Sequence, residues 1–301
     1  MGRSALPAVV RIREVGPRDG LQAEAPVPPK GRAALVDALA DAGLQEIEAV
    51  SFVSPRAVPA MAGAADVMAA VRRRPAVRYL ALVPNRKGAE LALAADMDGL
   101  TVTVSASPAY NQRNVHMSVD QSVAAVAEIA EVVAPRALPV DAVVSCAFGS
   151  PYEGDIDPAD VHGVGERLRD AGATSLTYAD TTGMATPRRV HELLELVGPD
   201  VGLHLHDTRG TALVNAYAAL ERGVTRFDTA AGGLGGSPFA DGAGGNLATE
   251  DLVHLLDDLG VQTGVSLERV LSATALVAEL VSHAVPSRVA AAGPRGRTEL
   301  G

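Results

Sequence analysis

Eight short apolar runs recur along this 301-residue chain, and they constrain its fold more than any other feature. Each run is rich in Val, Leu and Ile and is bounded by turn residues, a pattern typical of buried β-strands. The predicted strands span residues 9–15, 44–50, 77–83, 100–105, 138–146, 174–179, 201–206 and 224–229.

Helix-like segments separate these runs. Apolar residues recur at helical spacing over residues 32–42 and 119–133, and the segments 158–171 and 187–197 each begin with a proline, which the first helical turn tolerates. Three of the helices are expected to end at a glycine that turns the chain back into the next strand. These glycines are Gly43, Gly172 and Gly223.

Eight β–α units in about 250 residues are typical of a (β/α)8 barrel. A doubly wound open sheet uses similar units, but its Gly-rich fingerprint is absent after the first strand, where the chain reads GPRDG over residues 16–20. We therefore predict an α/β fold, a (β/α)8 TIM barrel with an additional C-terminal helix over residues 266–283. Residues 1–289 are expected to form one catalytic domain, and residues 290–301 a flexible tail.

Composition excludes several classes of function. The 36 acidic and 26 basic residues give a net charge of −10, which disfavours a nucleic-acid partner because phosphate binding needs a basic surface. No apolar run approaches the ~18–20 residues that span a bilayer, and residues 1–10 lack the apolar stretch of a signal peptide. Cys146 is the single cysteine, which rules out an internal disulfide and fits a cytoplasmic location.

Polar residues collect near the carboxyl ends of the predicted strands. In a barrel of this kind, the chemistry lies at that end of the strands. Charged side chains there are costly unless they are paired or bind a ligand. The residues are Glu14, Arg18, Asp19, Glu48, Ser145, Asp180, His204, His206, Asp207 and Asn246.

The sequence His204-Leu205-His206 is the most informative local feature. Residues two apart on a strand project from one face, roughly 6.6 Å apart along the strand, so both imidazoles could bind one metal ion. Alternatively, the histidines are unrelated and one bonds a backbone carbonyl. Asp19 would be a third ligand, or else a helix cap or arginine partner. A histidine and carboxylate set without thiolates suits Mn²⁺, Mg²⁺ or Zn²⁺.

A glycine-rich segment spans residues 232–246. It could be a flexible connection or a phosphate cradle, although the lysine and hydroxyl pattern of a nucleotide-binding P-loop is missing. Our interpretation is a lid over the barrel mouth, because glycines absorb the dihedral changes of closure.

Long motifs of this chain resemble those of the 3-hydroxy-3-methylglutaryl-CoA lyase family, in family order and over roughly residues 9–285. The wider superfamily comprises metal-dependent TIM-barrel lyases and Claisen-type synthases. The matching segments are REVGPRDGLQ (13–22), IEAVSFVSP (47–55), SPYEG (150–154), HLHDT (204–208), GLGG (233–236) and GNLATEDLV (245–253).

The resemblance implies cleavage of a 3-hydroxyacyl-CoA into acetyl-CoA and a 3-oxo acid. It implies that Arg18 lies beside the thioester carbonyl, that Gln22 and Ser51 contact substrate, and that Glu48 and Asp180 take part in catalysis. It also implies a homodimer and a divalent ion, Mg²⁺ or Mn²⁺. The metal ligands it implies are Asp19, His204, His206 and Asn246.

One residue departs from the family pattern. The family's lid carries a reactive cysteine where this chain has Ser237. A serine hydroxyl is a much weaker acid than a thiol with a pKa of about 8.5, so the final proton transfer is expected to differ. If the substrate is the family's own, Ser237→Cys should raise lyase activity.

Other functions remain open at this point. The chain could be a related barrel aldolase or a Claisen-type acyl transferase, although the long additional domain common to condensing enzymes is missing at 301 residues. It could also be a non-catalytic binding protein on a retained scaffold. Equilibrium metal binding separates the last hypothesis from the others.

Overall fold

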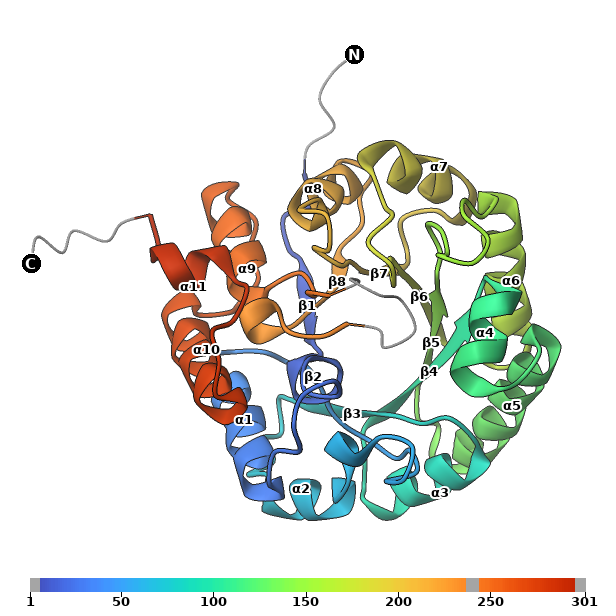
Figure 1. Ribbon diagram of the computed structural model, residues 1–301, viewed down its shortest axis with the longest axis horizontal. Coiled ribbons are helices and arrows are strands. Elements are labelled where there is room, and N and C mark those ends of the chain that lie inside the picture. Colours follow the sequence, from blue (N-terminus) through green and yellow to red (C-terminus); the bar gives the residue numbers. More distant parts are fainter. Residues whose placement is uncertain (1–5, 237–243, 296–301) are drawn as a thin grey trace, which may run out of the picture.

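The computed structural model describes residues 6–236 and 244–295. Eight parallel strands pair in chain order, and β8 pairs with β1 to close the barrel. Helices surround the strands (Figure 1), which confirms the predicted (β/α)8 barrel. The strands are β1 Arg11–Glu14, β2 Glu46–Ser51, β3 Arg78–Leu82, β4 Gly99–Ser105, β5 Val140–Ser145, β6 Ser175–Ala179, β7 Gly202–His204 and β8 Arg226–Thr229.

Eleven helices in the described part of the chain surround this barrel (Figure 1). They are α1 Pro29–Asp41, α2 Ala64–Ala70, α3 Arg86–Ala94, α4 Pro108–Val115, α5 Val119–Val133, α6 Pro158–Asp170, α7 Pro187–Val197, α8 Ala212–Glu221, α9 Thr249–Asp258, α10 Leu267–Val281 and α11 Arg288–Ala292. All except α4 and α11 contribute apolar residues to the continuous buried core. Single helical turns lie at Gly16–Gly20, Pro59–Met61, Ala134–Arg136 and Ala231–Gly233.

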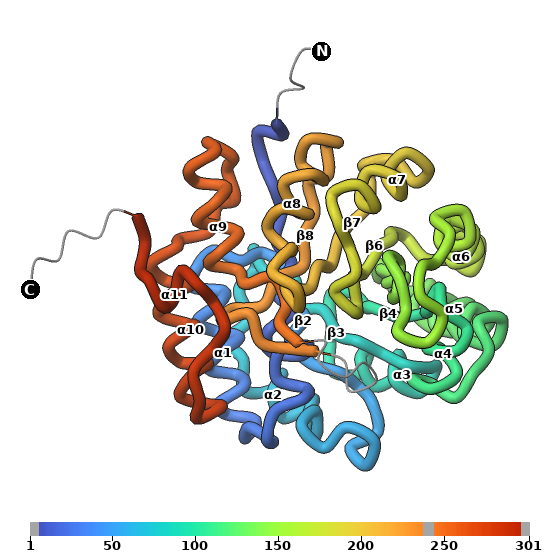
Figure 2. The backbone as a smooth tube through the Cα atoms, turned by 45° about the horizontal axis from the view of Figure 1, so that its top comes forward, coloured from blue at the N-terminus to red at the C-terminus, as the bar shows by residue number. Residues whose placement is uncertain are grey.

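The predicted additional helix corresponds to α10, whose N-cap is Ser266. Figure 2 places α10 and α11 beside α1 and α9, on the side of the barrel where the chain's first and last strands meet. The short helix α11 covers the first residues of the segment 290–301, so those residues are helical. The assignment of residues 1–289 to one catalytic domain stays a prediction.

The seventh strand ends earlier than predicted. We expected His204 and His206 on one strand, but β7 stops at His204. His206 instead forms an isolated antiparallel bridge with Asn246, beyond the end of β8. The backbone N–H of Leu247 donates to the carbonyl of Leu205 at 2.9 Å, which holds the two segments together. The chain after β7 thus pairs with the segment that carries Asn246.

No helix among the described residues is long and apolar enough to cross a membrane.

Candidate active site

A tight turn directly after β1 carries two of the predicted site residues. It is a π-helical turn, Gly16–Gly20, with Pro17 near its start. The Glu14 carboxylate accepts a hydrogen bond from the backbone N–H of Gly16 at 2.8 Å, which fixes the start of the turn. Arg18 and Asp19 are both buried, at 8% and 7% exposure, although they carry charge. Burial of this kind requires partners.

Asp19, His204 and His206 form the one group of three that could hold a metal ion in the described part of the chain. Their ligand atoms all lie within 4.8 Å of one another. The two Nε2 atoms are 3.1 Å apart, and His204 Nε2 lies 4.0 Å from Asp19 Oδ2. Two nitrogen atoms and one carboxylate oxygen suit a divalent cation.

Asn246 lies beside this group. Its side-chain nitrogen donates to Asp19 Oδ2 at 2.7 Å and to the carbonyl of Leu234 at 2.8 Å. With the nitrogen so engaged, the amide oxygen is the atom left to act as a ligand. Gly235 comes so close that an added Cβ would lie 2.3 Å from this nitrogen.

Arg18 lies between the metal-ligand group and a second carboxylate. Its Nη1 donates to Asp19 Oδ1 at 2.6 Å, and its Nε donates to Glu48 on β2. Thr101 on β4 donates its hydroxyl to the other oxygen of Glu48. Gln22 donates to Asp19 Oδ1 at 3.0 Å. Charge pairing therefore offsets the cost of burying Arg18.

Protonation of the two histidines differs. Burial, together with the neighbouring His204, lowers the pKa of His206 to about 4, so this ring is neutral near pH 7. Burial opposes charging of His204 too, but the hydrogen bond to Asp228 and the charge of Asp19 raise its pKa. Burial likewise disfavours the ionised form of Asp19, yet Arg18 and both histidines hold the pKa of that carboxyl below its usual range.

Comparison with known proteins identifies the family. The HMGL-like family model matches residues 9–277. The chain belongs to the HMGL-like family. A 3-hydroxy-3-isohexenylglutaryl-CoA/hydroxymethylglutaryl-CoA lyase of Pseudomonas aeruginosa is 41% identical, over 95% of this chain and 98% of its own. The mitochondrial hydroxymethylglutaryl-CoA lyase of Bos taurus is also 41% identical, over 95% of this chain and 90% of its own.

A solved structure of the family is similar throughout. It is an HMG-CoA lyase of Acinetobacter baumannii in complex with coenzyme A and 3-methylmalate, which is 38% identical. The two structures superpose with a TM-score of 0.92, over 97% of each chain.

The remaining predicted site residues of this HMGL-like chain are placed as follows. Asp180 follows β6, and its backbone N–H donates to the carbonyl of His204 at 2.8 Å. Asp180 Oδ1 accepts the N–H groups of Met184 and Ala185, while Oδ2 has no hydrogen-bond partner among the described residues. Burial raises the pKa of Asp180 to about 7.

The last two predicted site residues are Ser51 and Ser237. Ser51, at the end of β2, donates its hydroxyl to the carbonyl of Leu82 at 3.3 Å, a contact that does not involve Asp19, His204 or His206. Ser237 lies outside the described residues, as do residues 238–243 of the segment that we interpreted as a lid.

Sequence reasoning missed a buried polar network beneath the site. Asp228 on β8 contacts His204, and Arg13 on β1 contacts both Asp228 and Asp141 on β5. The available signal was the presence of charged residues within β1, β5 and β8, because such residues must find partners when buried. Their identity as partners depended on how the barrel closes.

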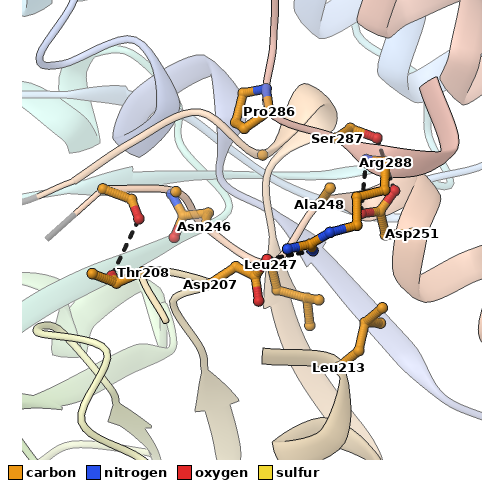
Figure 3. A pocket seen from close by; sticks show the side chains of 13 residues that line it. Asp207, Thr208, Leu213, Asn246, Leu247, Ala248, Asp251, Pro286, Ser287 and Arg288 are labelled. Atoms are coloured by element: carbon orange, nitrogen blue, oxygen red, sulfur yellow. Dashed lines mark hydrogen bonds and ion pairs between the residues drawn. The ribbon is translucent and has the colours of Figure 1, made fainter. Parts of the chain in front are cut away.

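A pocket lies on the other side of Asn246 (Figure 3), between the turn after β7 and the start of α11. Arg288 donates to Asp207 at 2.6 Å across it, and Ser287 donates to Asp251 at 2.8 Å. The start of α11 therefore lies close to the candidate metal site, because Arg288 pairs with Asp207, the residue after His206.

Proposed function

We propose that this chain is a metal-dependent carbon–carbon lyase that cleaves 3-hydroxy-3-methylglutaryl-CoA to acetyl-CoA and acetoacetate. The observation that carries the proposal is the contact of buried Arg18 with Asp19, one of the three residues that could hold a metal ion. Cleavage needs ionisation of the substrate hydroxyl and stabilisation of the departing carbanion. A divalent ion held at Asp19 would lower the pKa of the hydroxyl, and Arg18 beside it would stabilise the charge of the carbanion. Membership of the HMGL-like family supports the same reaction.

We assign the metal ligands to Asp19, His204, His206 and Asn246, with Mg²⁺ or Mn²⁺ as the ion. The donor set fits such an ion, because two imidazole nitrogens and a carboxylate oxygen lie within 4.8 Å of one another and are all buried. When bound, a divalent cation lowers the pKa of the substrate hydroxyl and fixes its orientation.

The chain's own residues then orient the substrate and stabilise charge. Arg18 uses Nε for Glu48 and Nη1 for Asp19, so we assign its Nη2 to the thioester oxygen, where the enolate charge develops. Glu48, held by Thr101, keeps the guanidinium fixed. Gln22 and Ser51 are proposed as further substrate contacts.

Asp180 is proposed to move a proton during the reaction. Its Oδ2 is buried without a partner among the described residues, and burial raises its pKa to about 7. A carboxyl group with this pKa exchanges protons at neutral pH. We propose that the Asp180 carboxyl exchanges a proton with the bound substrate.

A longer acyl chain is the second candidate substrate. The Pseudomonas aeruginosa relative is named for 3-hydroxy-3-isohexenylglutaryl-CoA as well as the methyl compound. The same cleavage chemistry would apply, because the acyl branch does not take part in bond breaking.

The test is an assay with both acyl-CoA compounds. The purified protein is stripped with a chelator and assayed with and without Mg²⁺ or Mn²⁺ for release of acetyl-CoA. We expect release from the methyl compound only when metal is present. Release from neither compound with either metal would overturn the proposal, and release from the isohexenyl compound alone would assign the second substrate.

Ser237 is proposed to stand in the place of the family's lid cysteine. Ser237→Cys should increase the rate of acetyl-CoA release, because a thiol is the stronger acid. Ser272→Cys, at an exposed position of α10, is the matched control and should leave the rate unchanged. An unchanged rate in Ser237→Cys would remove a proton-transfer role from this position.

We also propose a homodimer in the cytoplasm. The single cysteine is buried and free, which supports a reducing compartment. Light scattering coupled to size-exclusion chromatography would measure the mass of the assembly and decide between one and two copies.

A further inference from the structure

A buried charged network crosses the barrel interior beneath the proposed metal site. Arg13 on β1 donates from Nε to Asp228 Oδ1 at 2.8 Å and from Nη2 to Asp228 Oδ2 at 2.6 Å. Its third nitrogen, Nη1, donates to Asp141 Oδ2 at 2.7 Å on β5. Thr177 on β6 donates its hydroxyl to the same oxygen of Asp141 at 2.8 Å. None of these side chains is in the site described above.

Strand register brings this network to one of the metal ligands. Asp228 is the register partner of Arg13 on one side and of His204 on the other. Gly202 on β7 leaves space for Thr177, since an added Cβ would lie 2.5 Å from the Thr177 hydroxyl. Thr177 in turn contacts both Arg13 and Asp141.

The position of His204 follows from its contact with Asp228. His204 Nδ1 lies 3.2 Å from Asp228 Oδ2, while Nε2 faces His206 Nε2 at 3.1 Å. An ionised carboxylate only accepts hydrogen bonds, so Nδ1 must carry the proton that it donates. In a neutral His204 ring, Nε2 is then left with a lone pair on the side of Asp19. This is the form of imidazole that binds a metal ion.

We propose that Asp228, clamped by Arg13, is a positioning residue that fixes the ring orientation and tautomer of His204 for metal binding. The inference rests on the proposed metal site. Asp228 does not touch the substrate in this proposal and acts only through His204. The two-point contact with Arg13 prevents the carboxylate from rotating, and Asp141 in turn prevents Arg13 from moving away.

The test is the affinity for Mn²⁺, which is measured from the electron paramagnetic resonance signal of the free ion. Asp228→Asn should weaken Mn²⁺ binding by about 10- to 100-fold, the range typical of partners of metal-bound histidines. It should lower kcat while the KM for acyl-CoA stays near that of the wild type. Asp37→Asn is the matched control, because Asp37 is also an ion-paired carboxylate but binds Arg72 and Arg74 far from the site.

Wild-type affinity in a folded Asp228→Asn protein would overturn the positioning role. A wild-type protein that itself does not bind Mn²⁺ would instead overturn the metal site, so the two failures are distinguishable.

A second variant keeps the test decisive if Asp228→Asn does not fold. The double substitution Arg13→Met with Asp141→Asn removes one positive and one negative charge and leaves Asp228 in place. Asp228 then keeps His204 as its remaining ionisable partner. Weaker Mn²⁺ binding by the double variant supports the clamp, and unchanged or tighter binding overturns it.

Discussion

Glu14 is a fully buried carboxylate that joins three segments around the site. It accepts hydrogen bonds from the N–H groups of Gly16 and Ala231 and from the hydroxyl of Thr249. These residues belong to the turn after β1, the turn after β8 and the start of α9. Burial raises the pKa of Glu14 to about 7, because its hydrogen bonds only partly offset the loss of hydration.

This raised pKa predicts a specific pH dependence of stability. From about pH 4.5 to 7 the folded state keeps a proton that the unfolded state has lost, so the free energy of unfolding falls as pH rises through this window. The full effect is about 3 kcal/mol. Glu14→Gln should remove this contribution to the pH dependence of the free energy of unfolding. Urea unfolding in the presence of a chelator, at pH 5 and at pH 8, measures it.

Glutamine suits this comparison, because its oxygen can accept from both backbone groups while its amide donates to Thr249. The control is Glu131→Gln on exposed α5, which should follow the wild-type curve. A Glu14→Gln protein with the wild-type pH dependence would show that the carboxylate is already ionised at pH 5.

Gly235 predicts a second effect at the scale of one residue. Its φ of +115° is unfavourable for other residues, and a Cβ would lie 2.3 Å from Asn246 Nδ2 and 3.0 Å from Asp19 Oδ2. Gly235→Ala should therefore displace a metal ligand and weaken Mn²⁺ binding at least tenfold, by about 1.4 kcal/mol. Isothermal titration calorimetry measures this affinity.

The variant Gly260→Ala separates the effect of an unfavourable φ from the effect of a steric clash. Gly260 also has a positive φ, +73°, but an added Cβ meets no atom within 4 Å. It should cost about 1–2 kcal/mol of stability and leave metal affinity intact. Equal metal affinities in the two alanine variants would refute the steric argument.

At the scale of elements, α5 begins with a capping box. The Ser118 hydroxyl accepts the backbone N–H of Gln121, and the Gln121 side chain accepts the N–H of Ser118. Ser118→Ala should reduce the free energy of unfolding by about 1 kcal/mol, measured by urea denaturation. Because α5 lies on the outside of the barrel, kcat should not change (Figure 1). A loss of activity at unchanged stability would contradict this assignment.

Elements with local signals were predictable from the sequence. Helices α5 and α7 have the predicted bounds, since a cap or a proline marks each start and the apolar spacing marks the length. The end of β7 was predicted wrongly, because His206 pairs with Asn246, forty residues later, and no local pattern carries that information.

The same limit applies within the site. Motifs identified Arg18, Asp19, the two histidines and Asn246 as candidates, and the structure brings them together. Motifs did not reveal that Arg13 joins Asp228 to Asp141, because those contacts link residues that are 215 and 128 positions apart. Only strand order and register bring such residues into contact.

At the scale of the whole molecule, the proposed metal should stabilise the fold. A ligand that binds only the folded state adds about 2.7 kcal/mol when its concentration is 100 times Kd. Mn²⁺ should therefore raise the Tm by several degrees over chelator-treated protein, as measured by calorimetry. Asp19→Asn should lose this increase, and Asp37→Asn, outside the site, should retain it. A metal-independent Tm in the wild-type protein would contradict the ligand assignment.

The pairing of β1 with β8 has a consequence for how the protein is made. Asp19 and Asn246, which share a hydrogen bond, are 227 positions apart, so a ribosome must complete most of the chain before they can meet. A nascent chain that still lacks β8 and the segment after it holds Arg13 without Asp228 and Asp19 without Asn246. Catalytic competence should therefore appear late and all at once during biosynthesis, when the ring of strands closes.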